Sequence, residues 1–322
     1  MTIDTLAQDA ARNGPLFIVI NAASGNHGAG DVRAALTSVF SESGREFEFL
    51  EVTKPAQLQA QASRAVALAK ARGGVVVAAG GDGTINAVAK AVLDSGCPFG
   101  VLPQGTFNYF ARSHAIPQDT LAAAHALLRA SVQPVQVGKV NGQLFLVNAS
   151  LGLYPQLLED REAWKQQWGR SRLVAFAAGF ASLFQARGQL NLQIETADHA
   201  TALRTPTLFV GNNHLQLARV GIAEKDANSV QQGQLAGIVL RPIGTLALFG
   251  LLLRGVIGRL GDAENLHSFS FRRLRVTPRG RRRIKVATDG EVGWMQTPLV
   301  FEVAAEPLML LVPAPADRAE VA

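Results

Sequence analysis

The sequence predicts two domains: an N-terminal α/β domain with a doubly wound parallel sheet, and a C-terminal domain of mostly antiparallel strands. Up to residue 133, short apolar runs alternate with amphipathic segments, which is the pattern of strands joined by helices. After Pro134, strand-like runs follow one another with few helical segments between them. Residues 15–133 therefore form the first predicted domain and residues 134–305 the second.

Apolar runs mark the strands of the first domain. Val75–Ala79 contains no polar residue, so we expect both of its faces to be covered. Asp31 and Asp119 can each cap a helix, because an aspartate side chain accepts hydrogen bonds from first-turn amides. The expected elements are, in order, Leu16–Ile20, a helix after Asp31, Phe47–Val52, a helix over Gln57–Ala71, Val75–Ala79, a helix over Ile85–Leu93, Phe99–Leu102 and a helix from Asp119 to Arg129.

The second domain is predicted from a series of strand-like runs. Apolar residues at helical spacing interrupt them at Leu173–Phe184 and Leu246–Leu260. A last apolar run, Pro307–Val312, lies within residues 306–313, a segment that we expect to return to the first domain. The expected strands are Val135–Val140, Leu144–Asn148, Leu190–Glu195, Thr207–Val210, Leu235–Leu240, Ser268–Phe271, Leu274–Thr277, Ile284–Ala287 and Leu299–Val303.

Composition narrows the class of protein. Of 322 residues, 48% are hydrophobic and 17% charged, which is typical of a packed globular chain. The only cysteine, Cys97, excludes an intrachain disulfide and fits a reducing compartment. The longest apolar stretch, Ile243–Leu253, falls short of the ~20 residues that a membrane span needs. The start of the chain has no apolar core of a secretory signal, so we expect a cytoplasmic protein.

Net charge is +6, which favours polyanionic partners such as nucleotide phosphates, nucleic acid or an anionic membrane. Aromatic residues are not interleaved with the basic ones, so nucleic acid is not expected as a partner. A basic run, Arg279 to Lys285, would place Arg281, Arg283 and Lys285 on one strand face. That face could attract an anionic membrane or could simply be solvated.

The strongest local signal is Gly80-Gly81-Asp82-Gly83-Thr84, between a predicted strand and a predicted helix. Glycines at such a turn let backbone N–H groups approach phosphate oxygens, and the helix N-terminus favours the anion. Asp82 could hold a metal ion, and Thr84 could donate to a phosphate. The alternative is a tight turn with a capping residue.

Two further loops follow strands at the same end of the predicted sheet. Asn21-Ala22-Ala23-Ser24-Gly25 follows the first strand, and Pro103-Gln104-Gly105-Thr106-Phe107-Asn108 follows the fourth. Ligands of doubly wound sheets gather at the carboxyl ends of strands. Three polar, glycine-containing loops at equivalent strand ends therefore predict a phosphate site.

A fourth motif, Thr288-Asp289-Gly290-Glu291, lies far away in the sequence. Its carboxylates could supply a general base for a substrate hydroxyl. A plain hairpin is the alternative, because Asp-Gly is a strong turn signal.

Together the four motifs resemble the diacylglycerol kinase catalytic family of bacterial lipid kinases, which is related to sphingosine kinases. The resemblance runs from Phe17 to Val312, with the motifs in the family's order. Gly80–Thr84 alone is shared with NAD kinases, so Pro103–Asn108 and Asp289–Glu291 make the match specific. It implies an ATP-dependent, Mg²⁺-using lipid kinase with a nucleotide-binding α/β domain and a β-sandwich domain.

The resemblance also implies a role for each matched residue. Asp82 would lie near the magnesium, and Glu291 would accept the proton of the lipid hydroxyl, with the second catalytic carboxylate, Asp289, close by. The residues implied to bind the nucleotide are Asn21, Ser24, Gly25, Thr53, Gly80, Gly81, Asp82, Gly83, Thr84, Asn86, Gly105, Thr106 and Asn108.

The chain departs from the family's pattern at three places. Ala22 replaces the usual proline, and Tyr109 replaces the usual acidic residue after Asn108. The loop Gln231-Gln232-Gly233 lacks the Asp-Gly that many members carry near a structural magnesium, so no structural metal is expected there.

The expected partners are a lipid substrate at the membrane surface and, through peripheral contact, the inner face of the membrane. The two helical segments of the second domain could lie in the interface, although core-facing helices are the commoner case. A homodimer is left open. The competing functions are an NAD-kinase-like small-molecule kinase, and an inactive lipid- or nucleotide-binding regulator.

Overall fold

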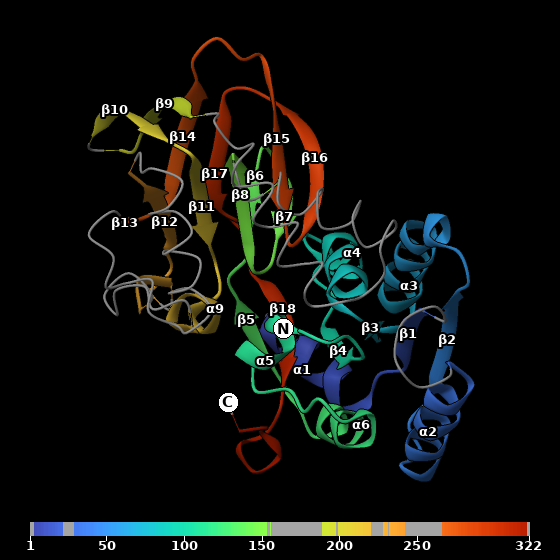
Figure 1. Cartoon of the computed structure of the whole chain (residues 1–322). Coiled ribbons are helices and arrows are strands. Elements are labelled where there is room, and N and C mark those ends of the chain that lie inside the picture. Colours follow the sequence, from blue (N-terminus) through green and yellow to red (C-terminus); the bar gives the residue numbers. More distant parts are fainter. Residues whose placement is uncertain are drawn as a thin grey trace, which may run out of the picture. The chain divides into compact units, whose positions relative to one another are not determined.

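The computed structural model describes residues 3–21, 29–152, 155, 189–197, 199–219, 228–230, 232–241 and 266–320. The chain divides into two compact units (Figure 1). Unit 1 comprises Met1–Val137 and Ala305–Ala322, and unit 2 comprises Gly138–Ala304. Both predicted helical segments of the second domain, Leu173–Phe184 and Leu246–Leu260, lie outside the described residues.

Unit 1 is built on a six-stranded sheet with the order β2-β1-β3-β4-β18-β5. Neighbouring strands from β2 to β18 run parallel, and β5 pairs antiparallel with β18. The strands are β1 (Leu16–Asn21), β2 (Phe47–Val52), β3 (Val75–Gly80), β4 (Phe99–Pro103), β5 (Ser131–Val135) and β18 (Leu308–Val312). The predicted α/β fold class is confirmed.

Helices cover both faces of this sheet. The helices are α1 (Ile3–Asn13), α2 (Ala29–Glu42), α3 (Leu58–Arg72), α4 (Asp82–Val92), α5 (Tyr109–Ser113) and α6 (Thr120–Leu128), with short 3₁₀ turns at Pro55–Gln57 and Pro315–Asp317. One core packs α1, α2 and α6 against alternate residues of β1 and β3, such as Ile18 and Val77. Helices α3 and α4 contact each other, and α3 contacts β1 and β3 while α4 contacts β3 and β4. Every residue of β3 is buried, as its wholly apolar sequence predicts.

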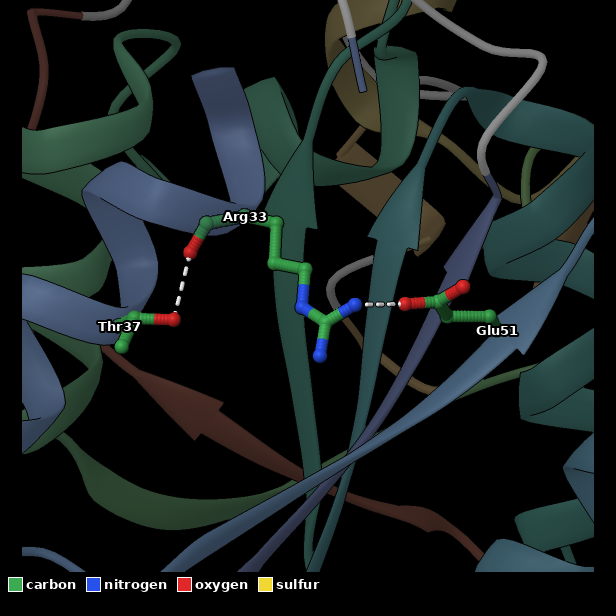
Figure 2. A network of polar contacts seen from close by, with 3 residues as sticks. All are labelled: Arg33, Thr37 and Glu51. Carbon is green, nitrogen blue, oxygen red and sulfur yellow. Dashed lines mark hydrogen bonds and ion pairs between the residues drawn. The ribbon is translucent and has the colours of Figure 1, made fainter. Parts of the chain in front are cut away.

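Polar contacts tie α2 to the edge strand β2. Figure 2 shows the Arg33 guanidinium of α2 donating to the Glu51 carboxylate of β2. The Arg33 guanidinium also lies 5.3 Å from the centre of the Phe49 ring. Thr37, one helical turn later, donates its hydroxyl to the Arg33 carbonyl at 2.8 Å. These contacts orient α2, which begins at Ala29.

Unit 2 consists of two antiparallel sheets, with the orders β10-β9-β14-β17-β6-β7 and β13-β12-β11-β8-β15-β16. A shared apolar core takes Phe145, Leu274 and Phe301 from the first sheet and Leu151 and Ile284 from the second, so the sheets pack face to face. The elements are β6 (Gly138–Val140), β7 (Gln143–Phe145), β8 (Asn148–Gly152), β9 (Leu190–Glu195), β10 (Ala200–Thr205), β11 (Thr207–Gly211), α9 (His214–Arg219), β12 (Leu235–Leu240), β13 (Leu266–Phe271), β14 (Arg273–Pro278), β15 (Arg283–Thr288), β16 (Glu291–Gln296) and β17 (Leu299–Val303).

The structure differs from the predicted elements in three respects. Helices α1, α5 and α9 and strands β10 and β16 were not predicted. The run expected as one strand over Val135–Val140 is shared between β5 and β6, and because β5 pairs with β18, unit 1 extends to Val137. The strand expected over Leu144–Asn148 is interrupted, because the amides of Leu146 and Val147 donate to the Asp289 side chain instead of to a neighbouring strand.

Candidate active site

The Gly80–Thr84 motif forms the connection from β3 to α4. Strand β3 runs to Gly80 and α4 begins at Asp82, so the motif supplies the first helical turn as well as the turn before it. The first amides of an α-helix have no acceptor within the helix. They are therefore suited to bind an anion at the carboxyl end of β3.

Gly80 is required by the packing of this turn. A Cβ atom at Gly80 would lie 2.7 Å from both Cβ and Oγ1 of Thr84. The Thr84 side chain is buried, and its hydroxyl accepts a hydrogen bond of 3.2 Å from the Asn21 amide at the end of β1. Thr84 and Asn21 thus fasten the ends of two adjacent parallel strands to each other.

Replacing Gly80 with alanine should destabilise unit 1. The added Cβ overlaps the Thr84 side chain, and overpacking of this kind typically costs about 1–3 kcal/mol. Thermal unfolding measures the effect. Gly30→Ala in α2 is the control, because nothing lies within 4 Å of a Cβ there. An unchanged melting temperature in Gly80→Ala would contradict the close packing of Thr84.

One oxygen of the Asp82 carboxylate accepts a hydrogen bond from the protein, and the other has no protein donor. Its Oδ2 accepts the backbone N–H of Asn108 at 2.9 Å, whereas its Oδ1 is buried without a hydrogen-bond partner among the described residues. Burial raises the pKa of the Asp82 carboxyl, and the amides of Asn108 and Tyr109 and the charge of Arg112 act against this shift. A buried carboxylate oxygen without a donor has the chemistry of a cation ligand.

The loop after β4 lies against the Gly80 turn. The Gln104 amide donates to the Gly80 carbonyl at 2.9 Å, and a Cβ atom at Gly105 would lie 3.0 Å from the Gly81 Cα. Asn108, at a φ of 47°, connects the two loops through its own N–H to Asp82. The predicted proximity of these two loops is therefore present within unit 1.

The Asn108 side chain forms hydrogen bonds to other residues of the protein. It is almost fully buried. Its Oδ1 accepts the Gly105 N–H at 3.0 Å, and its Nδ2 donates to the Gly105 carbonyl at 2.8 Å and to the Gln118 side chain at 2.9 Å. Asn108 therefore shapes the loop that presents the exposed Thr106. Gln118 was not identified from the sequence, since nothing in its local pattern marks it.

The other predicted nucleotide residues are placed as follows. Thr53 follows β2, where its amide and hydroxyl both donate to the Gln57 side chain at 3.1 and 3.0 Å. Asn86 is half-buried on α4, and Gly83 is exposed in its first turn. Ser24 and Gly25 lie outside the described residues.

The remaining predicted site residues, Asp289 and Glu291, belong to the turn between β15 and β16 in unit 2. The Asp289 carboxylate accepts three successive backbone amides, from Leu146 at 2.7 Å, Val147 at 2.8 Å and Asn148 at 3.0 Å. Its own amide donates to the Asn148 carbonyl at 2.9 Å. Glu291 is exposed at the first position of β16. Asp289 thus fastens the turn that presents Glu291, which is a positioning role.

Replacing Asp289 with alanine should destabilise unit 2 and displace Glu291. Three amides would lose their acceptor, and a buried donor left unsatisfied costs about 1–3 kcal/mol. Thermal unfolding and backbone amide NMR shifts of Leu146–Asn148 report the two effects. The control is Glu306→Ala, which removes an exposed carboxylate and should change little. Normal stability with unmoved amide shifts in Asp289→Ala would refute this role.

Residues 15–140 match the diacylglycerol kinase catalytic domain family. These residues are thus similar to a diacylglycerol kinase catalytic domain. The matched segment contains each of the nucleotide-site residues predicted from the sequence, from Asn21 to Asn108, and lies almost wholly in unit 1.

Two curated relatives that align with part of this chain are kinases by name. The "Diacylglycerol kinase" of Bacillus subtilis strain 168 is 44% identical over 89 residues, which are 27% of this chain and 29% of the relative. A "Probable lipid kinase YegS-like" of Pseudomonas aeruginosa PAO1 is 33% identical over 165 residues, 50% of this chain and 53% of the relative. The chain thus aligns with about half or less of either relative.

A solved structure shares the fold of this chain. The crystal structure of a diacylglycerol kinase from Bacillus anthracis Sterne superposes with a TM-score of 0.67 and 16% identity, covering 94% of this chain and 98% of the other. Within the part of the chain that the structure describes, no helix is both long and apolar enough to cross a membrane. No cluster of three or more metal-ligating His, Cys, Asp or Glu side chains occurs among the same residues.

Proposed function

We propose that this chain is an ATP-dependent lipid kinase that transfers the γ-phosphate to a hydroxyl of diacylglycerol or a related lipid. The observation that carries the proposal is the Asp82 turn: a buried carboxylate oxygen without a protein donor, at a glycine-opened helix N-terminus, inside a diacylglycerol kinase catalytic domain. The names of the relatives support a lipid acceptor.

The phosphate groups of ATP would lie against the first turn of α4. Amides of Asp82, Gly83 and Thr84 would donate to phosphate oxygens, and the N-terminal end of the helix dipole adds to the attraction. Gly81 and Gly105, which leave the backbone uncovered by side chains, allow the phosphates to come close. Thr106 and Asn21 would border the nucleotide.

Asp82 fits a magnesium ion, because Mg²⁺ prefers oxygen ligands and commonly uses one or two carboxylates together with phosphate oxygens and water. When bound, the ion would neutralise charge on the transferring phosphoryl group. The part of Asp82 is to hold Oδ1 fixed, through the hydrogen bond of Oδ2 to the Asn108 amide.

Glu291 would act as the general base. Its exposed carboxylate, at the start of β16, would accept the proton of the lipid hydroxyl while the oxygen attacks the γ-phosphorus. Asp289 would keep the turn in place. Because the acceptor lies in a bilayer, we propose peripheral contact of the protein with the inner face of the membrane.

The test is a transfer assay. Wild-type protein is incubated with ATP labelled in the γ-phosphate, Mg²⁺ and a total bacterial lipid extract in detergent micelles, and in a parallel reaction with NAD. The proposal predicts label in a lipid whose mass has risen by one phosphoryl group. Label in NADP alone would support the small-molecule kinase, and ATP binding without transfer to any acceptor would support an inactive regulator.

A further inference from the structure

Trp294 is an exposed aromatic residue in unit 2. It lies on β16, the edge strand of its sheet, and 59% of its surface is exposed. The other large hydrophobic residues that are exposed in the described part of the chain, Leu6, Phe107 and Leu121, all belong to unit 1. A tryptophan exposed on an edge strand calls for an explanation, because it adds nothing to the core and invites association.

Two cations flank the Trp294 ring. The Lys285 Nζ lies 5.5 Å from the ring centre and the Arg283 guanidinium carbon 5.7 Å from it, both from the neighbouring strand β15. The register pairs Lys285 with Trp294 and Arg283 with Gln296, so these residues share one face of the hairpin. The same face continues with Ala287 and Val292 and carries no acidic residue on either strand.

More positive charge lies at the end of the hairpin where β15 begins. Arg279, Arg281 and Arg282 are exposed in the turn that precedes β15. The turn is held by its backbone: Thr297 donates its hydroxyl to the Arg281 carbonyl at 2.6 Å and its amide to the Arg282 carbonyl at 3.0 Å. No acidic side chain of the described residues forms an ion pair with these arginines. Their charge is therefore available to an external anion.

The chemistry of this face fits an anionic bilayer better than the other polyanions. Tryptophan favours the membrane interface, where its apolar ring and its polar N–H are both accommodated, and adjacent Lys and Arg attract anionic headgroups. Non-specific single-strand binders stack bases on several aromatic side chains, whereas here there is one. A single exposed tryptophan among cations is also too small an apolar area for the core of a protein interface.

We propose that the face of the β15–β16 hairpin formed by Trp294, Arg283, Lys285 and the Arg279–Arg282 turn docks on an anionic lipid bilayer. The choice of partner rests on the proposed lipid kinase function. Glu291 begins the same strand, three residues or about 10 Å from Trp294. The Glu291 side chain lies on the opposite face of the hairpin, so docking would bring the start of β16 near the membrane without placing the proposed base on the docked face itself.

Flotation with vesicles tests the proposal. Wild-type protein should bind phosphatidylglycerol-containing vesicles more tightly than pure phosphatidylcholine vesicles, and added salt should weaken the binding. Trp294→Ala should weaken binding by about tenfold, the scale expected for losing one buried tryptophan ring. Arg283→Glu with Lys285→Glu should remove the preference for the anionic vesicles.

Matched controls separate this face from general effects. Leu121→Ala removes another exposed hydrophobic side chain, and Arg204→Glu reverses another exposed charge of unit 2. Both should bind vesicles as the wild type does. Circular dichroism and thermal unfolding confirm that each variant is folded.

Unchanged vesicle binding in folded Trp294→Ala and in the double charge variant would overturn the proposal. Equal binding of the wild type to both kinds of vesicle would overturn it too. So would variants that lose binding to double-stranded DNA while they keep their binding to vesicles. Turnover of a short-chain, water-soluble diacylglycerol should stay at the wild-type level in Trp294→Ala. If no lipid is phosphorylated while Trp294 still governs vesicle binding, the proposed function fails and the docking face stands.

Discussion

Replacing Asp82 with asparagine should lower phosphoryl transfer by about 10³-fold or more. The variant keeps the size of the side chain and an oxygen that can accept the Asn108 amide. It loses the negative charge that would hold magnesium, and a metal ion is worth several kcal/mol of transition-state stabilisation, with each 1.36 kcal/mol equal to about tenfold in rate. Label transfer from ATP to lipid at saturating Mg²⁺ measures the loss.

The same change should make the nucleotide-free protein more stable at neutral pH. Burial raises the pKa of Asp82 above its ordinary value of 3.8, so the folded state favours the neutral carboxyl. The stabilisation from the neutral form is present below the unfolded-state pKa and is lost as pH rises through the folded-state pKa. The gain in melting temperature of Asp82→Asn should therefore be largest at neutral pH and shrink as pH falls toward 4.

The control for both effects is Asp94→Asn, which makes the same chemical change at an exposed position just after α4. It should leave the rate and the pH dependence of the melting temperature unchanged. Wild-type turnover in Asp82→Asn would remove Asp82 from the phosphate site. A lower melting temperature at neutral pH would show that its charge stabilises the fold instead.

Replacing Glu291 with glutamine should lower kcat by about 10²–10⁴-fold, the usual contribution of a positioned general base. The KM for ATP should change little, because the proposed nucleotide contacts all lie in the other unit. Steady-state kinetics with varied ATP and varied lipid separate the two parameters. Glu306→Gln is the control, since this carboxylate is also exposed.

Full activity in Glu291→Gln would exclude Glu291 as the base. A large rise in the KM for ATP with an unchanged kcat would also contradict the assignment, because it would place Glu291 in nucleotide binding.

The sheet of unit 1 could be predicted because its strands and helices are locally distinct. Val75–Ala79 is too apolar for a strand with a solvated face, and it lies buried in the middle of the sheet. The loops after β1, β3 and β4 could be grouped for the same reason, since parallel neighbours bring their carboxyl ends together. Asn21 accordingly donates to the Thr84 hydroxyl, and the Gln104 amide donates to the Gly80 carbonyl.

Long-range partners could not be read from the sequence. The Asp289 carboxylate binds amides more than 140 residues earlier in the chain, and this contact both interrupts the strand expected over Leu144–Asn148 and gives Asp289 a structural role. Asn108, expected to face the nucleotide, is buried in contacts with Gly105 and Gln118. Only the tertiary fold brings the backbone partners of Asp289 near it, whereas Asn108 is satisfied by the backbone three residues earlier and by a side chain ten residues later.

The cation–π face of Trp294 was only partly foreseen. The alternation of Arg283 and Lys285 was visible in the sequence, but strand β16 was not predicted, because Gly293 and the mixed polarity of Glu291–Gln296 hide the period of two. The tryptophan could be joined to the cations only when the register of the hairpin was known.

Hydrogen–deuterium exchange with a non-hydrolysable ATP analogue and Mg²⁺ tests most directly whether the triphosphate binds where Asp82 lies. We predict slower exchange of the amides of Gly81–Asn86 and Gly105–Asn108, with β9 and β14 unaffected, and no such protection in Asp82→Asn. Binding of the analogue without protection of these two loops would contradict the account.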